Sequence, residues 1–148
     1  MKVYVSNQQL VLPISKNSVK KAVAAILSLE GITCNEVGVH FVDSIKICEL
    51  HYIYFNDPSI TDCISFPILQ TDHDFINLGD IFICPEVAQQ YAVKYEGNPY
   101  TETTLYLIHG LLHLIGYDDM EKGKRISMRA AERRHMKNLQ LNHLLLIP

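Results

Sequence analysis

The sequence predicts a mixed α/β fold, with a small, largely parallel sheet of four strands packed with about five helices. Segments with apolar residues at every second position alternate with longer segments whose apolar residues recur at helical spacing. Helices separate most of the predicted strands, but residues 61–67 and 78–84 are close enough in sequence to be antiparallel neighbours. With 148 residues, 48% hydrophobic and 20% charged, the chain suits a single domain over residues 1–148.

The first two elements are predicted to be a strand and a helix. Apolar residues alternate with polar or amphipathic ones over residues 2–6, which is the pattern of a short strand. After a loop, Ser15 or Asn17 can cap a helix that Gly31 ends. The apolar residues of this helix recur on one side, so we expect that side to face the core.

The next two elements are again a strand and a helix. Residues 36–43 alternate as a half-buried strand, which puts His40 on its solvated side. Residues 45–55 form a helix that ends before a turn-rich segment, and His51 lies off its apolar stripe. The apolar residues assigned to that stripe are Ile47, Leu50, Ile53 and Tyr54.

The second half of the chain contains the two neighbouring strands and three helices. Pro85 occupies the first position of a helix that ends at Gly97. A buried helix follows over about residues 102–115, and Gly116 ends it. A long basic helix then extends to about residue 143.

Composition predicts a cytoplasmic protein. No apolar run approaches the roughly 20 residues that span a bilayer, and the N-terminus lacks the apolar core of a signal peptide. The four cysteines form no C-x-x-C pair, so we expect reduced thiols without disulfide partners and no zinc-cysteine site. The apolar end, residues 144–148, is expected to dock on the core or on a partner.

One stretch, HGLLHLIGYDD at residues 109–119, has the spacing of a metal site. Side chains four residues apart on a helix project from the same face, so His109 and His113 can bind one ion. After the turn at Gly116, either Asp118 or Asp119 can fold back and supply a carboxylate. The stretch therefore predicts a three-ligand site on a buried helix.

Residues 121–137 carry seven basic and two acidic residues, although the whole chain has a net charge of −3. A basic segment directly after a metal site can hold an anionic polymer, because phosphate contacts supply most non-specific affinity for nucleic acid. The alternative is an ordinary solvated helix face. The candidate RNA-binding residues are Lys124, Arg125, Arg129 and Arg133.

Three segments, HGLLHLIGYDD, TDCISFP and LGDIFICPE, together resemble the signature segments of the YbeY family of rRNA maturation factors. The resemblance implies a mixed α/β domain with one zinc ion at the histidine motif. It also implies a single-strand-directed, metal-dependent endoribonuclease that processes the 3′ end of small-subunit rRNA and acts in ribosome quality control. The expected partner is the small ribosomal subunit or its rRNA.

The chain departs from the family pattern at two positions. Asp119 replaces the third histidine, so the expected ligands are His109, His113 and Asp119, which suit zinc but also iron or manganese. Asp118 is then expected either to hydrogen-bond and orient a ligand or to be a turn residue, rather than to bind the metal. Phe55 replaces an arginine that is suited to hold a phosphate. The alternative function is therefore a ribosome-assembly factor with a mainly structural metal and weak or no cleavage.

Residues that move protons are not identified by the motif. The candidates are Asp62, Asp80 and His73. Gly110 stands where H-E-x-x-H peptidases have their general base, which counts against a protease. Gly110 is instead expected to allow close packing of the site helix on the sheet. A hydrolase of another class rests only on generic metal ligation.

Overall fold

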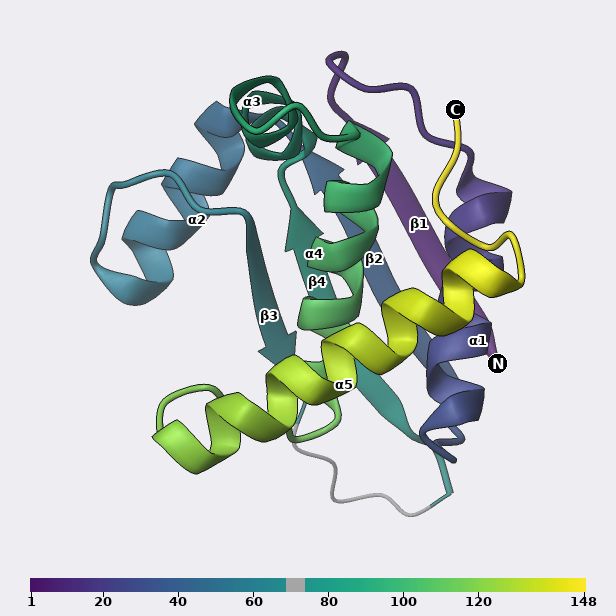
Figure 1. Cartoon of the computed structure of the whole chain (residues 1–148). Coiled ribbons are helices and arrows are strands. Elements are labelled where there is room, and N and C mark those ends of the chain that lie inside the picture. The colour runs from purple at the N-terminus through teal and green to yellow at the C-terminus, as the bar shows by residue number, and fades with distance from the viewer. Residues whose placement is uncertain (69–73) are drawn as a thin grey trace.

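The structure is a computed structural model that describes residues 1–68 and 74–148. Over these residues a four-stranded sheet has the order β1-β2-β4-β3 (Figure 1). Strands β1, β2 and β4 pair in parallel, and β3 pairs antiparallel with β4, which confirms the predicted largely parallel sheet. The strands are β1 (Lys2–Gln8), β2 (Glu36–Val42), β3 (Cys63–Pro67) and β4 (Asn77–Ile83).

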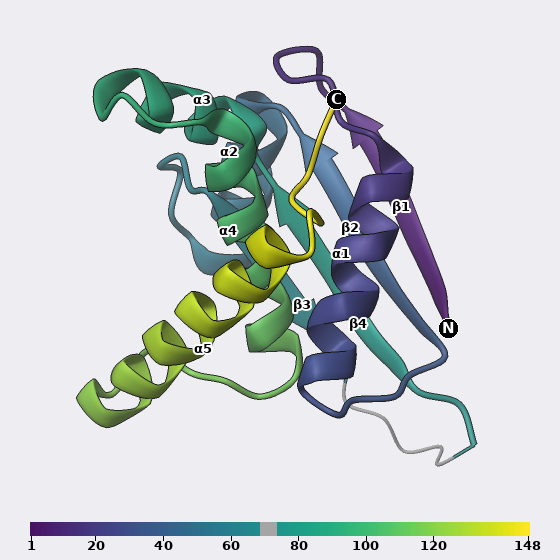
Figure 2. The ribbon, with the colours of Figure 1, turned by 45° about the vertical axis from the view of Figure 1, so that its right-hand side comes forward.

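Five helices pack with this sheet over the same residues. They are α1 (Lys16–Leu29), α2 (Ser44–Phe55), α3 (Pro85–Lys94), α4 (Pro99–Leu114) and α5 (Lys122–Leu141). Helices α1 and α4 lie against one face, and α5 crosses over α4, as the two views show (Figures 1 and 2). None of the helices in the described part of the chain is both long and apolar enough to cross a membrane.

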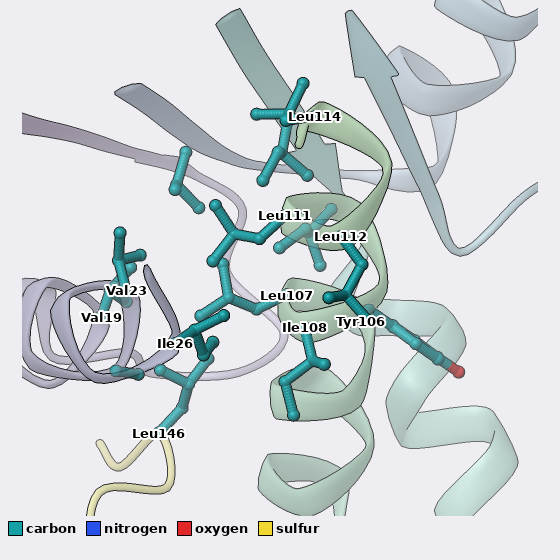
Figure 3. Close-up of a cluster of buried hydrophobic side chains, with 14 of the residues drawn as sticks. Val19, Val23, Ile26, Tyr106, Leu107, Ile108, Leu111, Leu112, Leu114 and Leu146 are labelled. Carbon is teal, nitrogen blue, oxygen red and sulfur yellow. The ribbon is translucent and has the colours of Figure 1, made fainter. Parts of the chain in front are cut away.

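The main core lies between the sheet, α1 and α4. Figure 3 shows Val19, Val23 and Ile26 of α1 pointing toward the leucine-rich side of α4. Odd-numbered residues of β2 and β4 cover the same core from the sheet, because successive side chains of a strand alternate between its faces. Helix α4 is thus buried on most sides, as its sequence predicts.

Helix α4 begins three residues earlier than predicted. The Asn98 side chain accepts hydrogen bonds from the backbone N–H groups of Tyr100 and Thr101, and Pro99 occupies the first turn. Both are favoured at a helix start, since the first amides have no partner within the helix and proline needs none. The turn chemistry of Asn-Pro therefore starts the helix that carries the site.

Gly110 brings α4 close to the sheet, as the sequence predicts. A Cβ atom at this position would lie 2.6 Å from Ile81 Cγ2 and 3.3 Å from the Ser65 hydroxyl oxygen. The Ser65 hydroxyl also donates a hydrogen bond to the Gly110 carbonyl at 2.9 Å. The absence of a side chain at Gly110 thus sets the distance between the site helix and the edge of the sheet.

Two expectations about burial were wrong. Strand β2 is not half-buried, because it is central and five of its seven residues are buried. His40 stacks on Phe82 with ring centroids 4.7 Å apart and hydrogen-bonds Ser6 and Asp80, so its side chain is only 24% exposed. In the expected apolar stripe of α2, Ile47 is buried and Leu50 packs against the same cluster, but Ile53 and Tyr54 are mostly exposed.

The C-terminal segment docks on the core rather than extending away from it. Leu146 is 1% exposed, and its N–H donates to the Thr104 hydroxyl oxygen on α4 at 3.1 Å. The Ser15 N–H, at the start of α1, donates to the Ile147 carbonyl at 2.8 Å. The end of the chain therefore connects the two helices that cover the sheet.

Candidate metal centre

Three of the predicted site residues converge. His109 and His113 lie one turn apart on α4, and their Nε2 atoms are 3.1 Å apart. Asp119, in the turn after α4, places Oδ2 3.8 Å from His109 Nε2 and 3.6 Å from His113 Nε2. Ligands at about 2.1 Å from a tetrahedral zinc ion lie about 3.4 Å from one another. The spacing of the three atoms therefore fits a single ion.

The turn after α4 has the conformation that returns the carboxylate to the histidines. Gly116 has a φ of +107°, which residues with a side chain rarely adopt. The Tyr117 N–H donates to the Leu112 carbonyl at 2.9 Å, which closes the end of the helix. Asp118 accepts the Met120 N–H at 3.0 Å and so acts within the turn, while Asp119 faces the histidines.

Each histidine is held through its other ring nitrogen. His113 Nδ1 lies 3.1 Å from the Tyr117 carbonyl oxygen, and His109 Nδ1 lies 2.7 Å from Glu132 Oε1. Because a carbonyl and a carboxylate accept hydrogen bonds, Nδ1 of each ring carries the proton and Nε2 presents its lone pair. Both rings thus have the tautomer and orientation that metal ligation by Nε2 requires.

Glu132 is a functional residue that the sequence reasoning missed. It lies on α5, its side chain is 6% exposed, and both its oxygens lie 2.8 Å from an Arg129 nitrogen. Burial raises the pKa of Glu132, but hydrogen bonds from His109 and Arg129 outweigh burial and leave the pKa below its ordinary value. Its spacing from the buried Met128, Ala131 and His135 could have identified it, since these residues share one helix face.

A pocket of about 370 Å³ opens in front of the two histidines. Strand β3 lines its floor, and α2 forms the wall opposite α4. The lining residues are His51, Phe55, Thr61, Cys63, Ile64, Ser65, Pro67, His109 and His113. Burial, with Asp62 nearby, raises the pKa of Cys63 well above its ordinary value, so this residue is a neutral thiol in the pocket floor. All four cysteines are free thiols in the structure.

Neither Asp80 nor Asp62 lines this pocket. Asp80 pairs with Gly38 and Phe66 on the sheet face away from α4, and its Oδ1 lies 2.8 Å from His40 Nε2. Asp62 precedes β3, and its carboxylate accepts the Cys63 N–H at 2.7 Å. His73 lies outside the described residues.

The four candidate RNA-binding residues have different surroundings on α5. The Arg125 guanidinium donates to the Met120 carbonyl at 3.2 Å, and Arg129 holds Glu132. Lys124 lies 3.9 Å from Asp118 and from Glu121 and is 56% exposed. Arg133 is exposed, and within the described residues no ion pair involves it. Part of the basic charge therefore supports the site, and part is free to meet solvent.

Comparison with known proteins gives a consistent result. The family model described as Endoribonuclease YbeY matches residues 4–140. The Endoribonuclease YbeY of Protochlamydia amoebophila is 48% identical over 136 residues, which is 91% of this chain and 91% of that protein. The Endoribonuclease YbeY of Chlamydia pneumoniae is 36% identical over 99% of this chain and 96% of that protein.

A solved structure shares the fold. The solution structure of TM1509 from Thermotoga maritima superposes with a TM-score of 0.66 at 24% identity, over 92% of this chain and 87% of that one. The family model's match over residues 4–140 includes α4, the turn after it and most of α5. These segments carry the three converging side chains and Glu132. The chain therefore belongs to the Endoribonuclease YbeY family.

Proposed function

We propose that this protein is a metal-dependent endoribonuclease that hydrolyses phosphodiester bonds in single-stranded segments of precursor rRNA. The observation that supports this most directly is the convergence of His109, His113 and Asp119 at the edge of an open pocket. Its relatives are named as endoribonucleases, which supports hydrolysis of RNA. Processing of the 3′ end of small-subunit rRNA and ribosome quality control are the proposed roles, within one domain acting in the cytoplasm.

The three converging side chains would hold one divalent ion per chain, and zinc is the proposed metal. The imidazole and carboxylate donors also suit iron or manganese. Such an ion supplies an activated water molecule and polarises a phosphoryl oxygen. Glu132 and the Tyr117 carbonyl fix the two imidazoles before an ion binds, so little reorganisation is needed. Asp119 lowers the charge of the site relative to three histidines.

Contacts to the RNA backbone are proposed to come from α5. Among the described residues, the pocket lining contains neither lysine nor arginine, and Phe55 stands where the family pattern that the sequence resembles has an arginine. Lys124 and Arg133 are exposed on α5, the helix that supplies Glu132 to the site. We infer that these cations hold phosphates beside the pocket, which replaces part of the missing charge.

Two other functions have less support. A ribosome-assembly factor with a structural metal does not need the pocket in front of the ligands, and the family name favours cleavage. A peptidase of the H-E-x-x-H type needs a glutamate where Gly110 faces Ile81 and Ser65. Asp62 stays the proposed candidate for proton transfer, because it directly precedes Cys63 in the strand that lines the pocket floor.

Purified protein incubated with a single-stranded RNA and with a duplex of the same sequence tests the proposal. We expect cleavage of the single strand that a chelator stops and that added zinc or manganese restores. His113→Ala should abolish the cleavage. His143→Asn, which changes an exposed histidine at the far end of α5, should leave it unchanged. Equal cleavage by His113→Ala and the unaltered protein would overturn the site assignment.

A cellular experiment tests the RNA substrate. Cells depleted of the protein should accumulate small-subunit rRNA with an unprocessed 3′ end, and a plasmid copy should restore maturation. A copy carrying His113→Ala should be folded but should not restore it. Full maturation in cells with only that variant would favour the assembly-factor alternative.

A further inference from the structure

The wall of the pocket opposite the candidate metal ligands is aromatic. His51 and Phe55 of α2 form this wall, and His109 and His113 of α4 face it across the floor of β3. In the part of the chain that the structure describes, no lysine or arginine lines the pocket. A phosphate at this wall would therefore meet no permanent positive charge. The wall suits an uncharged, flat part of the substrate.

Phe55 presents free ring surface at this wall. It is 55% exposed although it lines the pocket. Its ring centroid lies 5.8 Å from that of His51 and 6.4 Å from that of Phe66, so neighbours contact the ring without covering it. A half-exposed phenylalanine at the mouth of a concave site gains free energy when a ligand covers it.

The position of Phe55 is fixed by the end of its helix. Asn56 adopts a left-handed conformation with φ of 54°, and its N–H donates to the Tyr52 carbonyl at 2.9 Å. One turn earlier, His51 Nδ1 donates to the Ser59 carbonyl at 2.8 Å, which ties α2 to the following turn. The backbone that carries the ring is thus fixed before a ligand arrives, which lowers the entropy lost on binding.

We propose that Phe55 stacks on an unpaired base of the RNA, next to the phosphate that lies at the candidate metal ligands. An aromatic side chain stacks on any of the four bases, and only a single strand can present an unstacked base to it. Phe55 is then a specificity-determining residue for single strands. This inference rests on the proposed function.

The test is a binding scan in which the RNA is varied one position at a time. Short single-stranded oligoribonucleotides, each with one abasic position, are bound to the protein in chelator, which prevents cleavage, and affinity is read by fluorescence anisotropy. One or two adjacent abasic positions should weaken binding about 5- to 150-fold, which is the range for one base-aromatic stack. With Phe55→Ala, the intact RNA should bind weaker by a similar factor, and the scan should become flat.

Three further variants separate stacking from other effects. Phe55→Trp should keep the affinity and the pattern of the scan, whereas Phe55→Leu, which stays apolar but has no ring, should lose most of both. Tyr52→Ala is the matched control, because Tyr52 is 57% exposed on the same helix but does not line the pocket. Its scan should equal that of the unaltered protein.

The outcomes distinguish the inference from the proposed function. If Phe55→Ala binds the intact RNA within twofold of the unaltered protein, or shows the same scan, the base-stacking role is wrong. Should the unaltered protein still cleave RNA in that case, the proposed function stands without it. If the unaltered protein neither binds nor cleaves RNA, both fail.

Discussion

Replacing Glu132 with glutamine tests how the site helix is supported. The change keeps the size of the side chain but replaces one acceptor oxygen with an NH₂ donor. His109 Nδ1 at 2.7 Å and the Arg129 guanidinium at 2.8 Å are both donors, so the NH₂ group must face one of them. With a side chain only 6% exposed, solvent cannot compensate fully for the lost acceptor.

The expected magnitude follows from these contacts. A buried donor left without an acceptor costs roughly 1–3 kcal/mol, so urea unfolding of the metal-free protein should lose about that much free energy. Affinity for zinc should fall about 10- to 100-fold, because the partner that orients a metal-binding histidine typically has an effect of that size. Competition with a chromophoric chelator measures the affinity.

Glu49→Gln is the control for this variant. Glu49 is 54% exposed on α2, and its ion pair with Lys46 is long, at 3.9 Å. Neutralising Glu49 should therefore change neither the free energy of unfolding nor the affinity for zinc measurably. If Glu132→Gln binds zinc as tightly as the unaltered protein, the carboxylate does not orient His109 for a metal. A loss of stability without a loss of affinity would give Glu132 a structural role alone.

Three other predictions concern packing and pH. Gly110→Ala should lower the free energy of unfolding by about 1–3 kcal/mol in urea, because its Cβ would lie 2.6 Å from Ile81 Cγ2. Leu146→Ala should lower it by about 2–5 kcal/mol, since Leu146 is 1% exposed, and an unchanged midpoint would show that the C-terminal segment is not docked. Burial raises the pKa of Glu30, but hydrogen bonds, chiefly from His135, outweigh burial and leave the pKa lowered from 4.5. The ionised Glu30 therefore stabilises the folded protein above pH 4.5, and this stabilisation is lost as the pH falls through the lowered pKa. Glu30→Gln should therefore lose less unfolding free energy between about pH 6 and about pH 3 than the unaltered protein, and equal losses would contradict this.

Local patterns in the sequence predicted the elements well. Alternation and helical spacing report which face of an element is apolar, and these depend only on nearby residues. Gly31 and Gly116, which adopt positive φ, ended the helices where expected. Helix α4 starts three residues before the predicted start at about residue 102, because Asn98 and Pro99 together cap it.

Burial was harder to predict, because it depends on the position of each element in the sheet. His40 lies on the face of β2 away from the main core, as the alternation predicts, but Ser6, Asp80 and Phe82 of the neighbouring strands contact its ring and leave it only 24% exposed. Helix α2 has the apolar residues of a packed helix, yet Ile53 and Tyr54 are 60% and 62% exposed. No local pattern distinguishes an apolar stripe that meets the core from one that stays largely exposed.

The sequence by itself predicted that the two histidines and a carboxylate after the turn lie close together, because all of them belong to one stretch of eleven residues at the end of a helix. Only the tertiary structure decided that Glu132 holds His109 from another helix and that Phe55 faces both histidines across a pocket. It also separated Asp80 from the site, by placing it on the opposite face of the sheet. The physical reason is range: helical spacing places residues four apart, whereas packing places residues from different helices and strands.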